Sequence, residues 1–96
     1  QVVVGNLSLD TAHKRVMMDS NPVDLTAKEY MLLTTFMQSP EKVMSKTELE
    51  DSLYGWGGEV ESNAIEFLIH SLRKKVGQAR IKNVRGLGWY ISNVVA

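Results

Sequence analysis

Apolar residues between positions 65 and 76 recur at intervals of three and four, and this pattern constrains the fold more than any other. They are Ile65, Leu68, Ile69, Leu72 and Val76. On a helix that turns about 100° per residue, the other four lie within about 60° of Ile65. Such an apolar face must pack against a core. The sequence therefore predicts a helix over about residues 62–76 with one buried and one solvent-facing side.

The opposite side of this predicted helix carries an unusual mixture of chemical groups. They belong to Asn63, Phe67, His70, Ser71 and Lys74. A helix fits the major groove of B-DNA, where an amide can pair with adenine, an imidazole or ammonium with guanine, and an apolar ring with a thymine methyl. This side therefore suits base reading. The alternative is that Phe67 packs under a glycine-rich loop and that the polar groups are only solvated.

Two further helices are predicted from capping boxes, in which a hydroxyl side chain precedes a glutamate by three positions. The pairs are Thr26 with Glu29 and Ser45 with Glu48. The first helix should end at Ser39-Pro40, because proline disfavours helical geometry just before it. The second should run through Leu53 and end at the three glycines within residues 55–58.

Short strand-like segments lie before and after the helices. Residues 2–4, 6–10, 15–18 and 23–25 are apolar or alternate between apolar and polar, with a predicted turn at residues 19–22. Val43-Met44 is a candidate for one extended step between the helices. Residues 80–94 predict a hairpin that turns at 85–88. The order predicts one α+β domain over residues 1–96, with a small antiparallel sheet, three helices and a terminal hairpin.

The formal net charge is zero, but the charges are distributed unevenly along the chain. Residues 1–66 hold five basic and all eleven acidic side chains, which gives minus six, and residues 67–96 hold six basic side chains and no acid, which gives plus six. The six are Arg73, Lys74, Lys75, Arg80, Lys82 and Arg85. Zero net charge argues against a nucleic-acid partner, whereas the asymmetry favours a polyanion at one end. A solvated basic surface is the alternative.

The hairpin offers a second candidate contact to nucleic acid. Arg85 lies at its tip, between Asn83 and Gly86. An arginine on a narrow turn can enter a minor groove, where the negative potential is strongest in A·T tracts. Arg80 and Lys82 are candidates for phosphate contacts. An ordinary hairpin with one exposed arginine is the alternative, and the pairing of this hairpin with a groove-sized helix favours the DNA interpretation.

Three stretches together resemble the DNA-binding domain of the OmpR/PhoB family of two-component response regulators. They are residues Leu25–Leu33, Ser62–Val76 and Val84–Tyr90, which resemble the first helix, the recognition helix and the wing of that family. Residues Leu53–Trp56 and Glu61–Asn63 are most similar to its PmrA/QseB-like branch. The resemblance implies a winged helix-turn-helix with an N-terminal four-stranded antiparallel sheet, three helices and a C-terminal hairpin wing at about residues 80–92.

The resemblance also implies which residues contact DNA. The matching positions are Asn63, Phe67, Leu68, His70, Ser71, Arg73, Lys74, Asn83 and Arg85. Four positions depart from the common pattern. Leu68 stands where many relatives have His, Ser71 where many have Arg or Asn, Trp89 where Tyr is usual, and Phe67 where a smaller Val is common. These departures put the operator sequence in doubt and leave the fold expectation unchanged.

Partners of this chain are likewise implied by the resemblance. The loop Gly55–Glu61 matches a loop that touches RNA polymerase in some relatives, which would place Trp56, Glu59 and Glu61, with Glu50 and Asp51, toward polymerase; a plain connector is the alternative. Relatives join this domain to a receiver phosphorylated by a sensor kinase in a bacterial phosphorelay. We expect that receiver to be absent from this chain, the isolated domain to be monomeric, and dimers to form on direct repeats in double-stranded DNA.

Other functional classes are disfavoured by what the sequence contains. Cysteine is absent, and His13 and His70 have no spaced partners for a metal site, so neither enzyme, metal nor cofactor is expected. Residues 55–58 lack the Lys-Ser/Thr of a phosphate-binding loop. No apolar run could cross a bilayer, and the missing disulfides favour the cytoplasm. A winged-helix protein-interaction module is the main rival, and structured RNA is disfavoured because its deep major groove excludes side chains.

Overall fold

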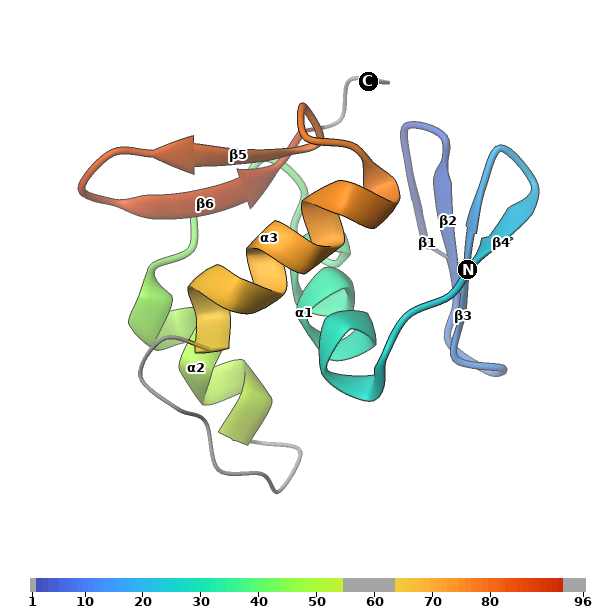
Figure 1. Ribbon diagram of the computed structural model, residues 1–96, viewed down its shortest axis with the longest axis horizontal. Helices are drawn as coiled ribbons and strands as arrows, with labels where there is room; N and C mark the ends of the chain where they lie inside the picture. The colour runs from blue at the N-terminus through green and yellow to red at the C-terminus, as the bar shows by residue number, and fades with distance from the viewer. Residues whose placement is uncertain (1, 55–63, 93–96) are drawn as a thin grey trace.

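The computed structural model describes residues 2–54 and 64–92, and within them the predicted order of elements is confirmed (Figure 1). The elements are β1 (Val2–Val4), β2 (Leu7–Asp10), β3 (Arg15–Met18), β4 (Asn21–Val23), α1 (Ala27–Met37), α2 (Lys46–Tyr54), α3 (Ala64–Val76), β5 (Ile81–Val84) and β6 (Gly88–Ile91). No helix in these two ranges has the length and apolar character needed to cross a membrane.

Both predicted capping boxes form, and they set where α1 and α2 begin. Thr26 Oγ1 accepts from the Glu29 amide at 3.2 Å, and Glu29 Oε1 accepts from the Thr26 amide at 2.9 Å. Ser45 and Glu48 make the same two bonds at 3.1 Å each. Each box satisfies two helix-terminal amides that the helix itself leaves without acceptors.

The N-terminal strands form one antiparallel sheet in the order β1-β2-β3-β4. Met18 pairs with Asn21, so only Asp19 and Ser20 form the turn between β3 and β4. The predicted four-residue turn at 19–22 was therefore wrong for Asn21 and Pro22, which belong to β4. Proline is tolerated there because β4 is an edge strand, where a missing amide breaks no inner ladder.

Ser20→Gly is expected to raise the free energy of unfolding by roughly 0.5–1 kcal/mol. Asp19 and Ser20 have φ angles of 51° and 66°, and a two-residue hairpin turn with two positive φ angles favours glycine in its second position. Urea denaturation measures the change. Ser8→Gly, in the extended backbone of β2, is the control and should destabilise the protein. A Ser20→Gly variant less stable than the parent protein would contradict this account.

Helix α1 lies at the centre of the molecule and contacts α2, α3, β1 and β6. In Figure 1 the sheet lies on one side of α1 and α2 lies on the other. The helix is buried on more than one face, because four of its side chains are completely buried: Leu32, Leu33, Phe36 and Met37. The core joins them to apolar side chains of the sheet, of α3 and of both hairpin strands. The sheet, the helices and the hairpin therefore share one hydrophobic core.

Candidate nucleic-acid interface

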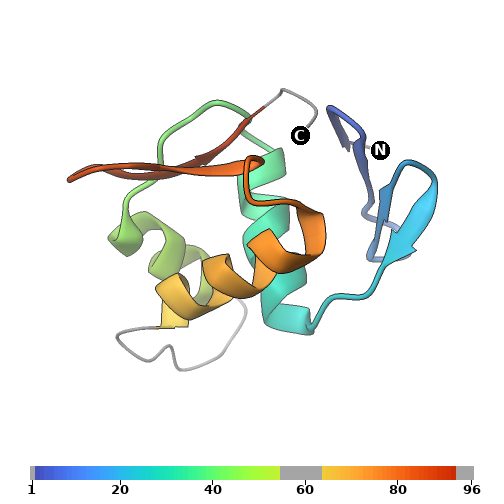
Figure 2. The same ribbon diagram turned by 45° about the horizontal axis from the view of Figure 1, so that its top comes forward.

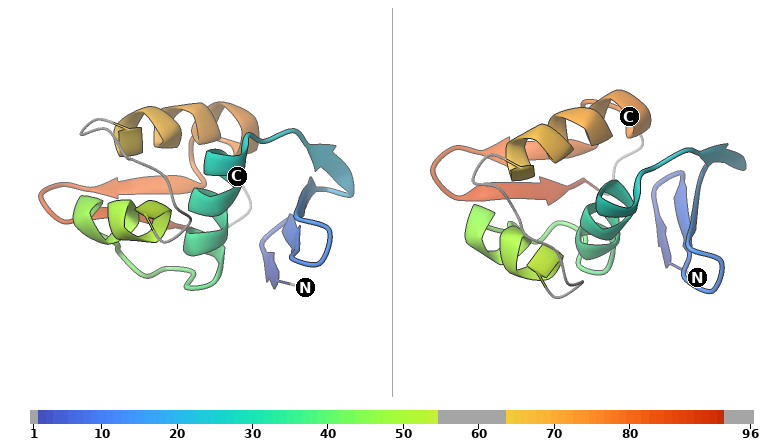
Figure 3. Two further views of the ribbon diagram at one scale, coloured as in Figure 1. Left: turned by 90° about the horizontal axis from the view of Figure 1, so that it is seen from below. Right: turned by 60° about the horizontal axis from the view of Figure 1, so that its bottom comes forward.

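Helix α3 has the two faces that its sequence predicted. Its apolar residues Ile65, Leu68, Ile69, Leu72 and Val76 are all buried, with at most 8% of their surface exposed. On the other face Phe67 is 71% exposed, and His70 and Lys74 are also exposed. Figure 3 shows α3 along one outer side of the molecule in both views. A large aromatic ring beside an imidazole and an ammonium is thus available to a ligand.

The β5–β6 hairpin projects from the body of the molecule, away from the N-terminal sheet (Figure 2). The amide of Leu87 donates to the carbonyl of Val84 at 2.9 Å, which closes a tight turn around Arg85 and Gly86. Gly86 has a φ of 80°, a backbone conformation that residues with a Cβ rarely adopt. Arg85 and Leu87 are both exposed at this tip. The turn therefore presents one cation and one apolar side chain at its narrow end.

The base of the hairpin is fixed to the segment between α1 and α2. Met44 and Trp89 exchange two backbone hydrogen bonds of 2.8 and 3.0 Å, and the Glu41 amide donates to Ile91 at 3.0 Å. The extended step predicted at Val43-Met44 is confirmed as an antiparallel bridge to β6. This bridge connects the wing to the helical part of the fold, so the wing has a defined direction.

Arg80 does not lie on the surface, which corrects its assignment as a phosphate contact. It is only 1% exposed. Its Nε donates to the Val76 carbonyl at 3.1 Å, and its terminal nitrogens donate to the Val4 carbonyl at 3.5 Å and to Asn6 Oδ1. Burial lowers the pKa of Arg80, while Asp19 raises it. Arg80 therefore joins the end of α3 to the N-terminal sheet and is not available to DNA.

Three other predicted contact residues make hydrogen bonds within the protein. The Ser71 hydroxyl donates to the Glu29 carboxylate. Arg73 Nε donates to the Ile81 carbonyl at 3.0 Å, and Asn83 Nδ2 donates to the Gly88 carbonyl at 3.3 Å. Ser71 and Arg73 are half-buried, and Asn83 is exposed. The first two bonds tie α3 to α1 and to the wing, and the third lies within the wing. The roles of these side chains at DNA stay predictions.

Sequence reasoning assigned Glu29 only a capping role, but the structure gives this residue a second one. Glu29 is 2% exposed, and Lys75 Nζ donates to its Oε1 at 2.7 Å. Burial raises the pKa of the Glu29 carboxyl, but the hydrogen bonds from Lys75, Ser71 and Thr26 together lower it by more than burial raises it. The resulting pKa is about 2, below the ordinary value of 4.5. The partners lie 42 and 46 residues away in sequence, so no local pattern indicates the contact.

The basic surface is smaller than the sequence count suggests. Of the six cations in residues 67–96, Arg80 is buried and Lys75 is paired with Glu29. Lys74, Lys82 and Arg85 are exposed on α3 and the wing. At the start of α3, Glu66 lies 3.3 Å from Lys46 of α2. The positive charge therefore lies on the last turn of α3 and along the wing.

Several predicted residues lie outside the part of the chain that the structure describes. They are Asn63 of the recognition helix and Trp56, Glu59 and Glu61 of the loop expected to face polymerase. Of the two acids expected near that loop, Asp51 is exposed and Glu50 is half-buried on α2. The polymerase hypothesis therefore stays a prediction.

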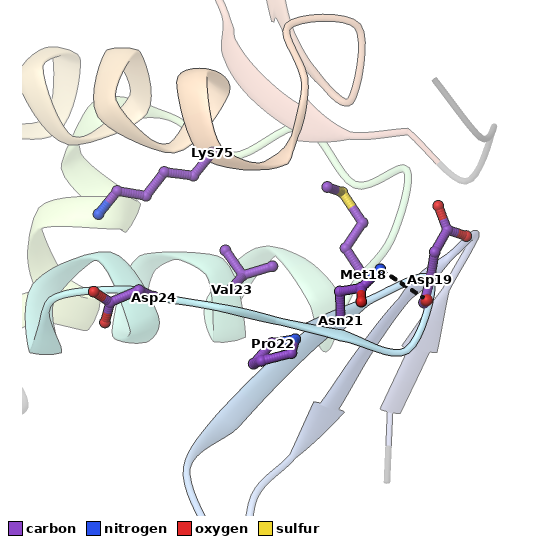
Figure 4. A pocket seen from close by; sticks show the side chains of 7 residues that line it. All are labelled: Met18, Asp19, Asn21, Pro22, Val23, Asp24 and Lys75. Carbon is purple, nitrogen blue, oxygen red and sulfur yellow. Dashed lines mark hydrogen bonds between the residues drawn. The ribbon is translucent and has the colours of Figure 1, made fainter.

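An open hollow of about 490 Å³ lies between the β3–β4 hairpin and the end of α3 (Figure 4). Its lining residues are Met18, Asp19, Asn21, Pro22, Val23, Asp24 and Lys75. Figure 4 shows the Lys75 side chain running toward the start of α1 and not over Met18 and Asn21. Within residues 2–54 and 64–92, no group of three or more His, Cys, Asp or Glu side chains could hold a metal ion.

Known proteins with similar sequences are transcriptional regulators. The family described as "Transcriptional regulatory protein, C terminal" matches residues 20–91. The chain is 47% identical over 91 residues to the response regulator protein PmrA of Pseudomonas aeruginosa, covering 95% of this chain and 41% of PmrA. It is 38% identical to the transcriptional regulatory protein BasR of Escherichia coli strain K12, with the same two coverages. The chain thus spans about two fifths of the length of these relatives.

Solved structures of other proteins share the fold of this chain. The DNA-binding domain of CpxR from E. coli has a TM-score of 0.80 and 26% identity, with 99% of this chain and 97% of that one covered. The DNA-binding domain of RstA from Klebsiella pneumoniae, solved in complex with the RstA box, has a TM-score of 0.83 at 23% identity, with 96% of each chain covered. The fold is therefore a winged helix, as the family resemblance implied. With most of its length matched by one family, the chain belongs to the C-terminal domains of transcriptional regulatory proteins, of the OmpR/PhoB type.

Proposed function

We propose that this chain binds double-stranded DNA in a sequence-specific manner, as the output domain of a bacterial two-component response regulator. Helix α3 enters the major groove, and Arg85 at the wing tip enters the adjacent minor groove. The observation that carries the proposal is the exposed face of α3, with Phe67, His70 and Lys74, on the same domain as a projecting wing with Arg85 at its tip. The role requires no cofactor and no catalytic group.

The similarity to complete response regulators extends the proposal to the whole protein. PmrA is named a response regulator, and RstA was solved with its DNA box. We propose that a receiver domain, phosphorylated by a sensor kinase, belongs to the same protein in the cytoplasm. Phosphorylation then promotes dimers on direct repeats, and the loop with Trp56, Glu59 and Glu61 faces RNA polymerase. Within the complete protein, this domain is the part that contacts DNA.

The exposed side chains divide into three roles. Phe67 packs against a thymine methyl and His70 donates to guanine, so both read bases. Lys74 and Lys82 neutralise phosphates, which adds affinity for any sequence. Arg85 reads the width and negative potential of a minor groove. Base reading and phosphate binding respond differently to salt and to sequence, and this difference makes the proposal testable.

Selection of bound sites from random duplex DNA tests the function directly. Repeated selection should enrich one half-site sequence in direct repeats with fixed spacing. The affinity for that site, followed by fluorescence anisotropy, should fall steeply with salt, with a log–log slope of about −0.9 per phosphate contacted. No enriched sequence together with a flat salt response would refute DNA binding and favour a protein-interaction module.

Variants of two neighbouring side chains on α3 should separate base reading from phosphate binding. His70→Ala is expected to cost roughly 1–3 kcal/mol at one base pair of the selected site and to leave binding to random DNA nearly unchanged. Lys74→Ala is expected to weaken binding to selected and random DNA alike and to reduce the salt slope by about one. Anisotropy titrations against the selected site and its single-base variants measure both effects.

The two variants also serve as controls for each other, since both side chains are exposed on one helix. If His70→Ala left the base preference untouched, the assignment of His70 would be wrong. Arg85→Ala completes the set, because its loss should be largest on A·T-rich flanks. An equal loss on G·C-rich flanks would argue against insertion of Arg85 into the minor groove.

A further inference from the structure

One buried carboxylate connects the start of α1 to two successive turns of α3. Glu29 Oε2 accepts from the Ser71 hydroxyl, and Glu29 Oε1 accepts from Lys75 Nζ at 2.7 Å and from the Thr26 amide at 2.9 Å. Only 3% of the Glu29 side chain is exposed, against 36% of the Lys75 side chain. The acceptor is thus buried within the protein, while the lysine reaches it from the surface.

The spacing of the two α3 residues that bind Glu29 determines how the helix is held about its own axis. Ser71 and Lys75 are four residues apart, so they lie one above the other on a single face of α3. A common acceptor for both resists rotation of the helix about its own axis. Because Phe67, His70 and Lys74 are on the same rigid helix, the rotation of α3 sets where these three side chains point.

The pair also decides which lysine is available to a polyanion. Arg73, Lys74 and Lys75 follow one another in the last turn of α3. Without its ion pair, Lys75 would be available to neutralise a DNA phosphate, as Lys74 is. Figure 4 shows Lys75 turned toward the start of α1. A buried carboxylate without its cation is costly, so the pair should persist when DNA is present. The pKa of about 2 for Glu29 agrees with a carboxylate stabilised by its partners.

We infer that Glu29 is a positioning residue for base reading: it fixes the rotation of α3 through Ser71 and Lys75 and withholds both side chains from DNA. This inference rests on the proposed function. It assigns direct reading to Phe67 and His70 and assigns Ser71 an indirect role. It further implies that the protein limits its own affinity for random DNA, because Lys75 is held by a carboxylate of the protein itself.

Four proteins test the inference: the parent chain, Glu29→Gln, Lys75→Met and the double variant. The readout is the salt slope of binding to the selected site and to random duplex DNA. Glu29→Gln frees Lys75, so the slope should become steeper by about 0.9 and random DNA should bind more tightly. The preference for the selected site over its His70-dependent base variant should fall about tenfold. Lys75→Met should leave the slope unchanged, and the double variant should return it to the parent value.

A merely structural role for Glu29 would reduce all binding without a slope change that depends on Lys75, and that result would overturn the inference. Lys75→Met supplies a second test that does not depend on whether Glu29→Gln folds. A slope reduced by about 0.9 in Lys75→Met would show that Lys75 already contacts phosphate, which would also refute the inference. If the parent chain selects no DNA site, the proposed function is wrong. The measurement on the parent chain shows this without the variants, so the two failures are distinguishable.

Discussion

Replacement of Glu29 by alanine is expected to lower the free energy of unfolding by about 3 kcal/mol. The change removes the buried acceptor shared by Thr26, Ser71 and Lys75. It leaves a half-buried hydroxyl and a lysine that has lost its partner, and it deletes one side of a capping box. Urea denaturation followed by circular dichroism measures the loss.

Glu48→Ala is the matched control, because Glu48 occupies the same third position of a capping box at the start of α2. Glu48 makes the same two cap bonds with Ser45 but is exposed, and its Oε2 lies 4.0 Å from Lys42 Nζ. Its removal should therefore cost much less than the removal of Glu29. Equal losses in the two variants would show that the contacts to α3 contribute nothing.

The same carboxyl makes stability depend on pH in a definite direction. The pKa of Glu29 is about 2 in the folded protein against an ordinary value of 4.5, so the folded state favours the charged form. Its contribution is complete above pH 4.5 and is lost as the pH falls toward 2, and the difference corresponds to about 3 kcal/mol. Asp10 and Glu48 also have lowered pKa values, so the comparison of the parent chain with Glu29→Gln isolates Glu29.

Gly88→Ala is expected to destabilise the protein by about 3–4 kcal/mol or to detach the wing from its base. A Cβ at this position would lie 2.0 Å from the Met44 carbonyl oxygen and 2.7 Å from its carbon, and the φ angle of Gly88 is 145°. Because the obstacle is backbone, no side-chain rotation relieves it. Thermal denaturation and hydrogen exchange at the Met44 and Trp89 amides measure the two outcomes.

Gly86→Ala provides the control within the same turn. Gly86 also has a positive φ angle, of 80°, but a Cβ there would meet no atom within 4 Å. This variant should lose about 1 kcal/mol through backbone strain alone and should keep the Met44–Trp89 bonds. If Gly86→Ala were as damaging as Gly88→Ala, the close approach of Met44 would not be the cause.

Features that depend on nearby residues were predicted well from the sequence. The buried face of α3, both capping boxes and the step at Met44 each follow from spacing within one or two turns of chain. The turn at residues 19–22 was too long, because Pro22 is as compatible with an edge strand as with a turn.

Features that depend on distant residues were not predicted. Arg80 was placed on the surface because nothing in its local sequence shows that Val4 and Asn6, more than seventy residues earlier, supply its acceptors. Glu29 likewise received only a local role. In both cases the fold, and not the segment, decides whether a charged side chain faces water. The candidate site was therefore correct in its location on α3 and the wing, and incomplete in its internal supports.

The burial of Arg80 and the pairing of Lys75 with Glu29 have a kinetic consequence for a domain of zero net charge. Few cations remain on α3 and the wing to neutralise DNA phosphates. A single copy of the domain should therefore dissociate quickly from DNA of arbitrary sequence at physiological ionic strength. Stable occupancy then depends on a second copy held nearby, which raises the effective concentration of each reader at its half-site by tethering. Weak individual residence would thereby make occupancy responsive to whatever brings two copies together.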